Sequence, residues 1–88
     1  MSTQTVVHIV KRNDPLAIDL ILRQSAGSST TVILIQEAAR EVVGLAFPGD
    51  AVSIFVLQDD APENRRYPLV DYPKMLDMIL AADQVMVW

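Results

Sequence analysis

Apolar runs alternate with segments of helical periodicity along the whole of this chain. The run 5–10 is rich in β-branched residues and ends at the polar residues 11–13, a pattern typical of a buried strand. Further apolar runs predict four more short strands, at 31–35, 51–57, 67–70 and 84–88. Because these runs are apolar on both faces, we expect both faces of the sheet to be covered.

Helix signals occupy three of the segments between these strands. Asp14-Pro15 predicts a helix start, with a carboxylate cap followed by a proline, and helical spacing continues to Gln24. Apolar residues from Ala38 to Val43 mark one face of a second helix, and Asp71-Tyr72-Pro73 predicts the start of a third. The apolar side chains of that third helix are Met75, Leu76, Ile79 and Leu80. The segment 61–66 predicts a loop or a single helical turn.

Strands that alternate with helices predict an α/β fold built on a mostly parallel sheet. The crossover connections between parallel strands are expected to be right-handed. We therefore expect residues 1–88 to form a single small three-layer domain, with about five short strands and helices on both faces. The pattern does not give the order of the strands in the sheet.

The composition is unusually apolar for so short a chain. Hydrophobic residues make up 51% of the 88 positions, and the mean hydropathy is +0.29. A small domain has a large surface for its volume, so some of these side chains are expected to be buried against another subunit. The alternative is that buried parallel strands simply use many Val, Ile and Leu residues.

Charge and hydropathy exclude two classes of partner. The net charge is −4 and the seven basic residues are scattered, apart from the pairs Lys11-Arg12 and Arg65-Arg66, so the cationic stripe that direct nucleic-acid binding needs is missing. The apolar runs are too short to span a membrane, and the N-terminus shows no signal-peptide pattern. We therefore expect a cytoplasmic protein that contacts neither nucleic acid nor membrane directly.

The segments that follow the predicted strands are polar, as the functional rim of a parallel sheet would be. Capping of a helix explains Asp14 and Asp71 better than function does. Capping and function both stay open for the polar residues after the second and third strands. These residues are Gln36, Glu37, Asp59 and Asp60.

The chain offers few groups for catalysis or for holding a cofactor. It contains no cysteine, and its single histidine, His8, lies inside a predicted strand and reads as an ordinary strand residue. No serine sits at a sharp strand-to-helix turn, and no glycine-rich phosphate loop follows a strand. We therefore predict no catalytic residue, no metal and no cofactor, and an enzyme is the last of the readings considered.

Trp88 is the last residue of an apolar strand. A terminal tryptophan that stays exposed is unfavourable unless its ring packs against something. One reading is packing within its own domain. The other is an anchor at a subunit interface, where large aromatic side chains often dominate the binding energy. The sequence leaves both readings open.

Several segments resemble those of the DsrH/TusB family of small sulfur-relay subunits, in the same order and spacing along almost the whole chain. These segments are Val7–Arg12, Ile33–Glu37, Ile54–Asp60, Val70–Pro73 and the Val-rich end at Trp88. Some members of the family carry a cysteine, and this chain departs from them. The segment before Leu69 is also shorter than in the family, so the surface at 61–66 is expected to differ.

The resemblance implies a DsrE/F/H-like fold and a place in a heterohexamer with DsrE/TusD-like and DsrF/TusC-like subunits. Such complexes pass persulfide sulfur toward tRNA 2-thiouridine synthesis or act in dissimilatory sulfur oxidation. A persulfide carrier needs a thiolate, so we expect a non-catalytic subunit that assists a partner's cysteine. The positions expected to face a partner are Gln36, Glu37, Asp59, Asp60 and Trp88. The alternative is a self-associating or small-ligand-binding α/β module outside any sulfur pathway, which would form a homo-oligomer when isolated.

Overall fold

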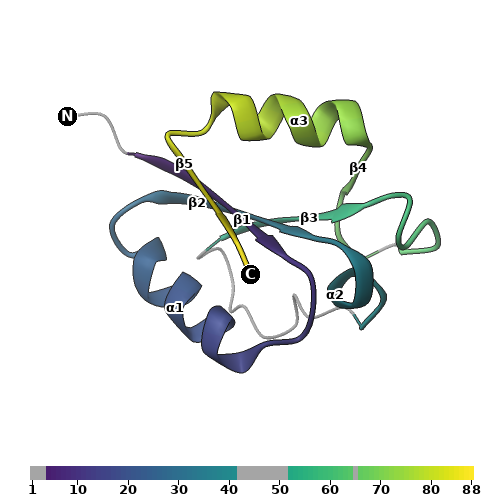
Figure 1. The fold of residues 1–88 in the computed structure, drawn as a ribbon, viewed down its shortest axis with the longest axis horizontal. Helices are drawn as coiled ribbons and strands as arrows, with labels where there is room; N and C mark the ends of the chain where they lie inside the picture. The colour runs from purple at the N-terminus through teal and green to yellow at the C-terminus, as the bar shows by residue number, and fades with distance from the viewer. Residues whose placement is uncertain (1–3, 42–51, 65) are drawn as a thin grey trace.

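The computed structural model of the protein describes residues 4–41, 52–64 and 66–88. Strands and helices follow one another in these ranges, as Figure 1 shows. The elements are β1 (Thr5–Val10), α1 (Pro15–Ser25), β2 (Ser29–Leu34), α2 (Gln36–Glu41), β3 (Ser53–Leu57), β4 (Leu69–Val70), α3 (Tyr72–Ala81) and β5 (Gln84–Val87).

All five strands belong to one sheet, in the order β4-β3-β2-β1-β5, and every neighbouring pair is parallel. The α/β class, the parallel sheet and the number of strands predicted from the sequence are therefore confirmed. The order shows that β1 lies between β2 and β5, while β5 has β1 as its one neighbour among the described residues. The first and last strands of the chain are thus side by side.

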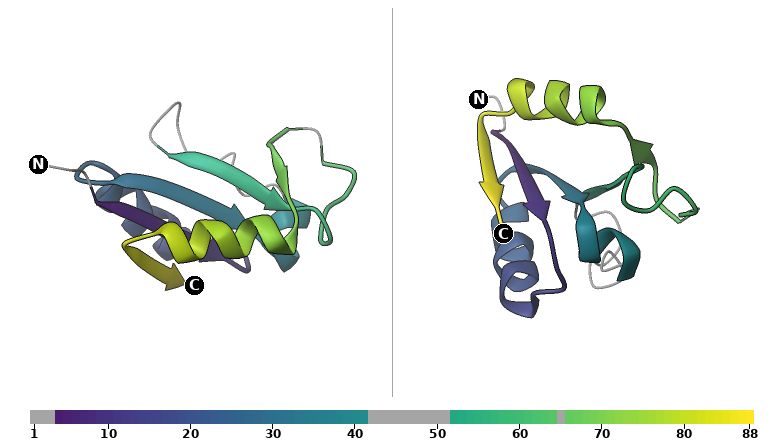
Figure 2. Two further views of the ribbon diagram at one scale, coloured as in Figure 1. Left: turned by 90° about the horizontal axis from the view of Figure 1, so that it is seen from above. Right: turned by 45° about the vertical axis from the view of Figure 1, so that its right-hand side comes forward.

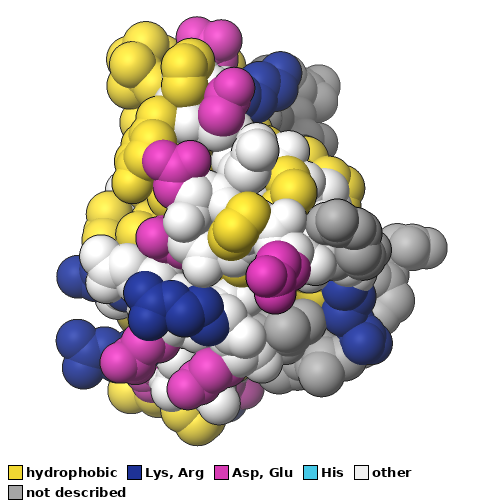
Figure 3. Space-filling view, turned by 90° about the vertical axis from the view of Figure 1, so that its right-hand side faces the viewer, with side chains coloured by type: hydrophobic (Ala, Val, Ile, Leu, Met, Phe, Trp, Pro, Cys, Tyr) yellow, Lys and Arg dark blue, Asp and Glu magenta, His cyan; other side chains and the backbone are white. Residues whose placement is uncertain are grey.

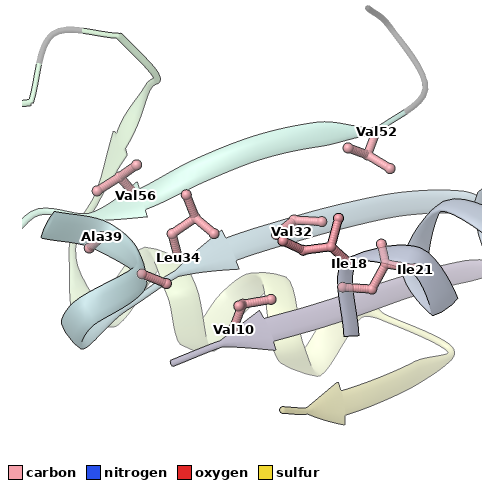
Figure 4. Close-up of a cluster of buried hydrophobic side chains, with 9 residues drawn as sticks. Val10, Ile18, Ile21, Val32, Leu34, Ala39, Val52 and Val56 are labelled. Atoms are coloured by element: carbon pink, nitrogen blue, oxygen red, sulfur yellow. The ribbon is translucent and has the colours of Figure 1, made fainter. Parts of the chain in front are cut away.

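Helices cover both faces of the sheet, which gives the expected three layers (Figures 1 and 2). One face is packed by α1 and α2, and its core contains Val10, Val32 and Leu34 from the two central strands. Figure 4 shows Val32 beside Ile18 and Ile21 of α1, and Leu34 near Ala39 of α2 and Val56 of β3. Their exposed fractions lie between 0% and 6%, so this layer is the dry centre of the protein.

The opposite face is covered by α3. Val7 and Ile9 of β1 and Ile33 of β2 are buried there, against the partly buried Met75 and Ile79 of α3. No residue of α3 is itself fully buried. One face therefore has two helices over it among the described residues, and the other has a single, shallowly packed helix.

Two aspartates begin helices as predicted. The Asp14 carboxylate accepts hydrogen bonds from the backbone N–H groups of Leu16 and Ala17, and that of Asp71 accepts one from Lys74. Both aspartates have extended backbones and are followed by a proline within the first turn. The carboxylates satisfy amides that have no partner within the helix, which explains the position of both starts.

Some boundaries differ from those predicted. Strand β2 begins at Ser29 because its N–H group donates to the carbonyl of Gln4 at 2.9 Å and lengthens the ladder with β1. Strand β4 has two residues, since Pro68 before it cannot donate a backbone hydrogen bond. The predicted helical positions Val42 and Val43, like Ala51 of the third predicted strand, lie outside the described residues.

Truncating the same side chain at two depths tests the division between core and surface. Leu34 is 0% exposed and Leu80 is 75% exposed. We expect Leu34→Ala to lower the free energy of unfolding by about 2–5 kcal/mol, because it removes buried methyl groups and leaves a cavity. Leu80→Ala is expected to lower it by less than about 1 kcal/mol. Urea denaturation measures both; equal losses would contradict the arrangement.

Candidate functional site

The carboxyl ends of β1 and β2 lie side by side and are tied to the start of α2. The Ile35 N–H group donates to the carbonyl of Val10 at 3.0 Å, and the Ala38 N–H group donates to the carbonyl of Lys11 at 3.1 Å. These bonds hold the segment after β1 against the first turn of α2. The segment after β1 and helix α2 border a hollow of about 370 Å³. It is lined by Lys11, Arg12, Gln36, Glu37 and Arg40. We call it the carboxyl-edge cleft.

Gln36, at the start of α2, contacts Asp60 in the turn after β3. The Gln36 N–H group donates to a carboxylate oxygen of Asp60 at 2.7 Å, across 24 residues of sequence. Gln36 has a φ of 52°, in the left-handed region that side chains other than glycine rarely adopt. The short bond to a carboxylate compensates part of the cost of that backbone conformation. Asp60 thus serves as a cap for α2 that comes from a different loop.

The predicted partner-facing residues separate into three groups. Gln36, Glu37 and Asp60 are brought together at the carboxyl edge of the sheet. Asp59 lies exposed in the turn after β3. Trp88 lies at the end of β5 and packs against the core on the α1 side. No contact with a partner is present to test these positions, so their role at an interface stays a prediction.

Arg40 belongs to the cleft but was not singled out from the sequence. It lies four residues after Gln36, which places both on one side of α2. This spacing could have placed Arg40 on the same side of the helix as Gln36. No local sequence pattern, however, shows that Lys11 and Arg12 lie near Arg40. Arg40 also borders a second hollow of about 310 Å³, which contains Asp60 and the turn that follows it.

Inside the protein, His8 of β1 contacts Trp88, the residue that follows β5. The Trp88 Nε1–H group donates to Nδ1 of His8 at 3.0 Å, and the rings are stacked with centroids 6.1 Å apart. His8 is 0% exposed, and its Nε2 is buried without a partner among the described residues. Because Nδ1 accepts, the neutral ring carries its proton on Nε2. Burial lowers the pKa of His8 below 6.5, since it disfavours the charged imidazolium.

This pair decides what Trp88 does within the protein. Of the two readings left open by the sequence, the structure shows packing within the domain, because the ring is partly buried and bonded to β1, and a role of Trp88 at an interface stays a prediction. His8 is a buried strand residue, as expected, but its partner was not foreseen. The two residues are 80 positions apart, so no local pattern links them.

A second surface is apolar and exposed. Six large hydrophobic residues are exposed in the described part of the chain, and five of them belong to α3 and β5. These five, which we call the α3–β5 surface, are Tyr72, Leu76, Leu80, Val85 and Val87. The remaining one is Leu16 of α1, on the other side of the sheet. The sequence marked Leu76 and Leu80 as helix-face residues, yet they are 54% and 75% exposed.

The strand and the helix contribute adjoining parts of this surface. Val85 and Val87 pair in register with Val7 and Ile9, so they point to the same face of the sheet as α3. Tyr72, Leu76 and Leu80 are spaced by four, which places them along one side of the helix. Figure 3 shows hydrophobic side chains at the top of the view, where α3 lies, and along one edge of the molecule below it.

Two kinds of site are missing from the described ranges. Residues 4–41, 52–64 and 66–88 contain no group of three or more His, Cys, Asp or Glu side chains arranged to hold a metal ion. Over the same residues, none of the helices combines the length and the hydrophobicity that crossing a membrane requires.

Comparison with known proteins adds no identification. No protein-family model matches the chain, and no curated protein matches its sequence.

The buried His8 ring predicts a pH-dependent stability. The unfolded chain protonates His8 near 6.5, whereas the folded chain does so at a lower pH. The contribution of neutral His8 to the free energy of unfolding is therefore fully present above pH 6.5. It is lost as the pH drops from 6.5 toward the lower pKa of the folded state, by at most about 1.4 kcal/mol per pH unit. Urea unfolding at about pH 7.5 and about pH 5.5 measures this fall. His8→Phe should abolish most of it; an unchanged slope would show that other groups cause the fall.

The bond between Trp88 and His8 can be removed without removing the aromatic ring. Trp88→Phe leaves Nδ1 of His8 without its donor, so we expect a loss of about 1–2 kcal/mol in the free energy of unfolding. Val87→Ala, one residue away and 61% exposed, is the matched control and should cost less than about 0.5 kcal/mol. Thermal or urea unfolding compares them; a Trp88→Phe protein as stable as the control contradicts the bond's importance.

Proposed function

We propose that this chain is a non-catalytic subunit of a sulfur-relay complex, in which it supports a partner that carries the persulfide. The pathway is tRNA 2-thiouridine synthesis or dissimilatory sulfur oxidation. The partners are DsrE/TusD-like and DsrF/TusC-like subunits, as the family resemblance implies. Any tRNA is met by a partner, since the net charge of this chain is −4.

The α3–β5 surface is the observation that carries this proposal. Five large exposed apolar side chains on one side of an 88-residue chain are typical of a subunit interface. Beside them, β5 pairs with β1 alone among the described strands, so within the described ranges its other edge is available to another strand. A partner that binds here covers apolar side chains and a strand edge together.

Burial of the α3–β5 surface contributes too little free energy to hold a partner by itself. Full burial of an exposed Val or Leu side chain contributes about 1.5–3 kcal/mol. These five side chains are 37–75% exposed, so their burial contributes on the order of 5 kcal/mol. Loss of translational and rotational freedom alone costs at least about 4 kcal/mol. A stable complex therefore needs the hydrogen bonds of the β5 edge or a wider contact as well.

The lack of a thiol limits the role that this chain takes in the relay. Sulfur is carried as a persulfide on a thiolate, and the sequence has no cysteine. The chain therefore contributes by holding a partner and shaping the surroundings of its thiol. Gln36, Glu37 and Asp60 are the predicted partner-facing residues that the fold gathers in one place, beside the cations of the carboxyl-edge cleft.

Self-association through the same surface is the second candidate, because the open edge of β5 can pair with that of another copy. Helix α3 packs against residues of β1 and β2, in a cluster that also contains Phe55 of β3 and Val70 of β4. Two copies joined at β5 would therefore hold their α3 helices at least about four strand spacings apart, roughly 20 Å or more. Packed helices lie about 8–10 Å apart, so Val85 and Val87 would keep exposed surface between them. A partner that brings its own helix covers that surface better.

Co-expression with candidate DsrE-like and DsrF-like chains tests the proposal. We expect the chain to co-elute with them in size-exclusion chromatography, and Leu80→Glu to reduce the recovered complex at least about tenfold, because it places a charge in the apolar interface. Leu16→Glu is the matched control, since Leu16 is 67% exposed but lies on α1. It should leave the complex unchanged.

Three results would count against this function. They are failure of the wild-type chain to co-elute with any candidate partner, equal effects of the two substitutions, and a stable homodimer that Leu80→Glu dissociates while no hetero-complex forms. Circular dichroism of both variants establishes that each is folded before it is compared.

A further inference from the structure

Three basic residues line the carboxyl-edge cleft. Lys11 and Arg12 follow β1, and Arg40 lies on α2. The chain has seven Lys and Arg residues, and all but Arg65 lie in the described ranges. Half of those six therefore line one hollow of about 370 Å³, in a chain whose net charge is −4. The fold thus brings Arg40 to Lys11 and Arg12, which are neighbours in the sequence.

These cations have no carboxylate partner among the described residues. Glu37 lines the cleft, but no carboxylate oxygen in residues 4–41, 52–64 and 66–88 lies within 4.0 Å of the side-chain nitrogens of Lys11, Arg12 or Arg40. The ion pair found in those ranges joins Arg23 to Asp19 at 3.0 Å. Like charges placed around one hollow repel each other, and a bound anion removes that repulsion.

The side chains around the cleft define the chemistry that fits it. The two guanidinium groups each present a planar fork of N–H donors that matches two oxygens of a phosphate, and Lys11 adds a point charge. The Glu37 carboxylate is an acceptor only. It repels a second anionic group but accepts a hydrogen bond from a hydroxyl. The lining therefore favours a ligand with one phosphate group and neutral hydroxyl groups.

We propose that the carboxyl-edge cleft binds a small phosphomonoester that carries hydroxyl groups. Lys11, Arg12 and Arg40 contact the phosphate, and Glu37 accepts from a hydroxyl. A hollow of about 370 Å³ lies at the lower end of the range of roughly 300–1,000 Å³ for small-molecule sites, and it exceeds what a phosphate group alone needs. Ligands of open parallel sheets bind beyond the carboxyl ends of the strands, which is where this cleft lies. The site does not depend on the sulfur-relay proposal.

Titration of the ¹⁵N-labelled full-length chain with glycerol 3-phosphate at fixed ionic strength tests this site. We expect saturable shifts of amide resonances centred on residues 11–12 and 36–40. Arg40→Gln should weaken binding about tenfold or more, because it removes a charge-assisted pair of hydrogen bonds. Arg23→Gln makes the same change of charge outside the cleft and should alter the affinity by less than about twofold. Arg12→Gln repeats the first test at a second position.

Distinct results would overturn the site or its ligand class. Shifts that rise linearly without saturation, or that centre on other residues, overturn the site. Equal weakening by Arg40→Gln and Arg23→Gln means a general charge effect and overturns it as well. Inorganic phosphate is the second probe; affinity equal to that of the ester overturns the hydroxyl contact with Glu37. Glycerol alone should produce no saturable shift, and a saturable one would overturn recognition through the phosphate.

Discussion

Helix α3 carries the packing of one whole sheet face in the described structure, and this constraint shapes the surface of the protein. A five-stranded sheet is roughly 20 Å wide, about twice the spacing of packed helices. The opposite face has α1 and α2 over it, whereas α3 buries no residue completely. Apolar side chains of the helix and of β5 are left in contact with solvent. The high apolar content of the chain thus reflects both buried strands and an uncovered surface.

Strand β1 contacts most other parts of the fold, through its hydrogen bonds and its side chains. It pairs with β2 on one side and β5 on the other, so the two ends of the chain meet along it. Its side chains alternate between the core under α3 and the core under α1, where His8 accepts the hydrogen bond from Trp88. Its carboxyl end is held to α2 through the carbonyl of Lys11. One strand therefore places the terminal tryptophan and one wall of the cleft.

The two surfaces are built by different parts of the fold. The α3–β5 surface is apolar and open along a strand edge, which suits another protein chain. The carboxyl-edge cleft is polar and hollow, and it is formed by α2 and the segment after β1. Because α2 and α3 cover opposite faces of the sheet, substitutions in the α3–β5 surface leave the lining of the cleft unchanged. Gln36 and Glu37 line the cleft and are also predicted to face a partner, so a partner that contacts them would compete with a ligand there.

The sequence by itself determined the features that arise between near neighbours along the chain. β-branched runs gave the strands, and Asp14 and Asp71 gave the helix starts through bonds to amides two or three residues away. Tertiary structure alone placed β5 beside β1, Arg40 beside Lys11, and Trp88 on His8 across 80 positions. The helical pattern also marked Met75, Leu76 and Ile79 alike, yet Leu76 stays exposed. Periodicity records which residues share a side of a helix, whereas burial depends on what other elements bring to that side.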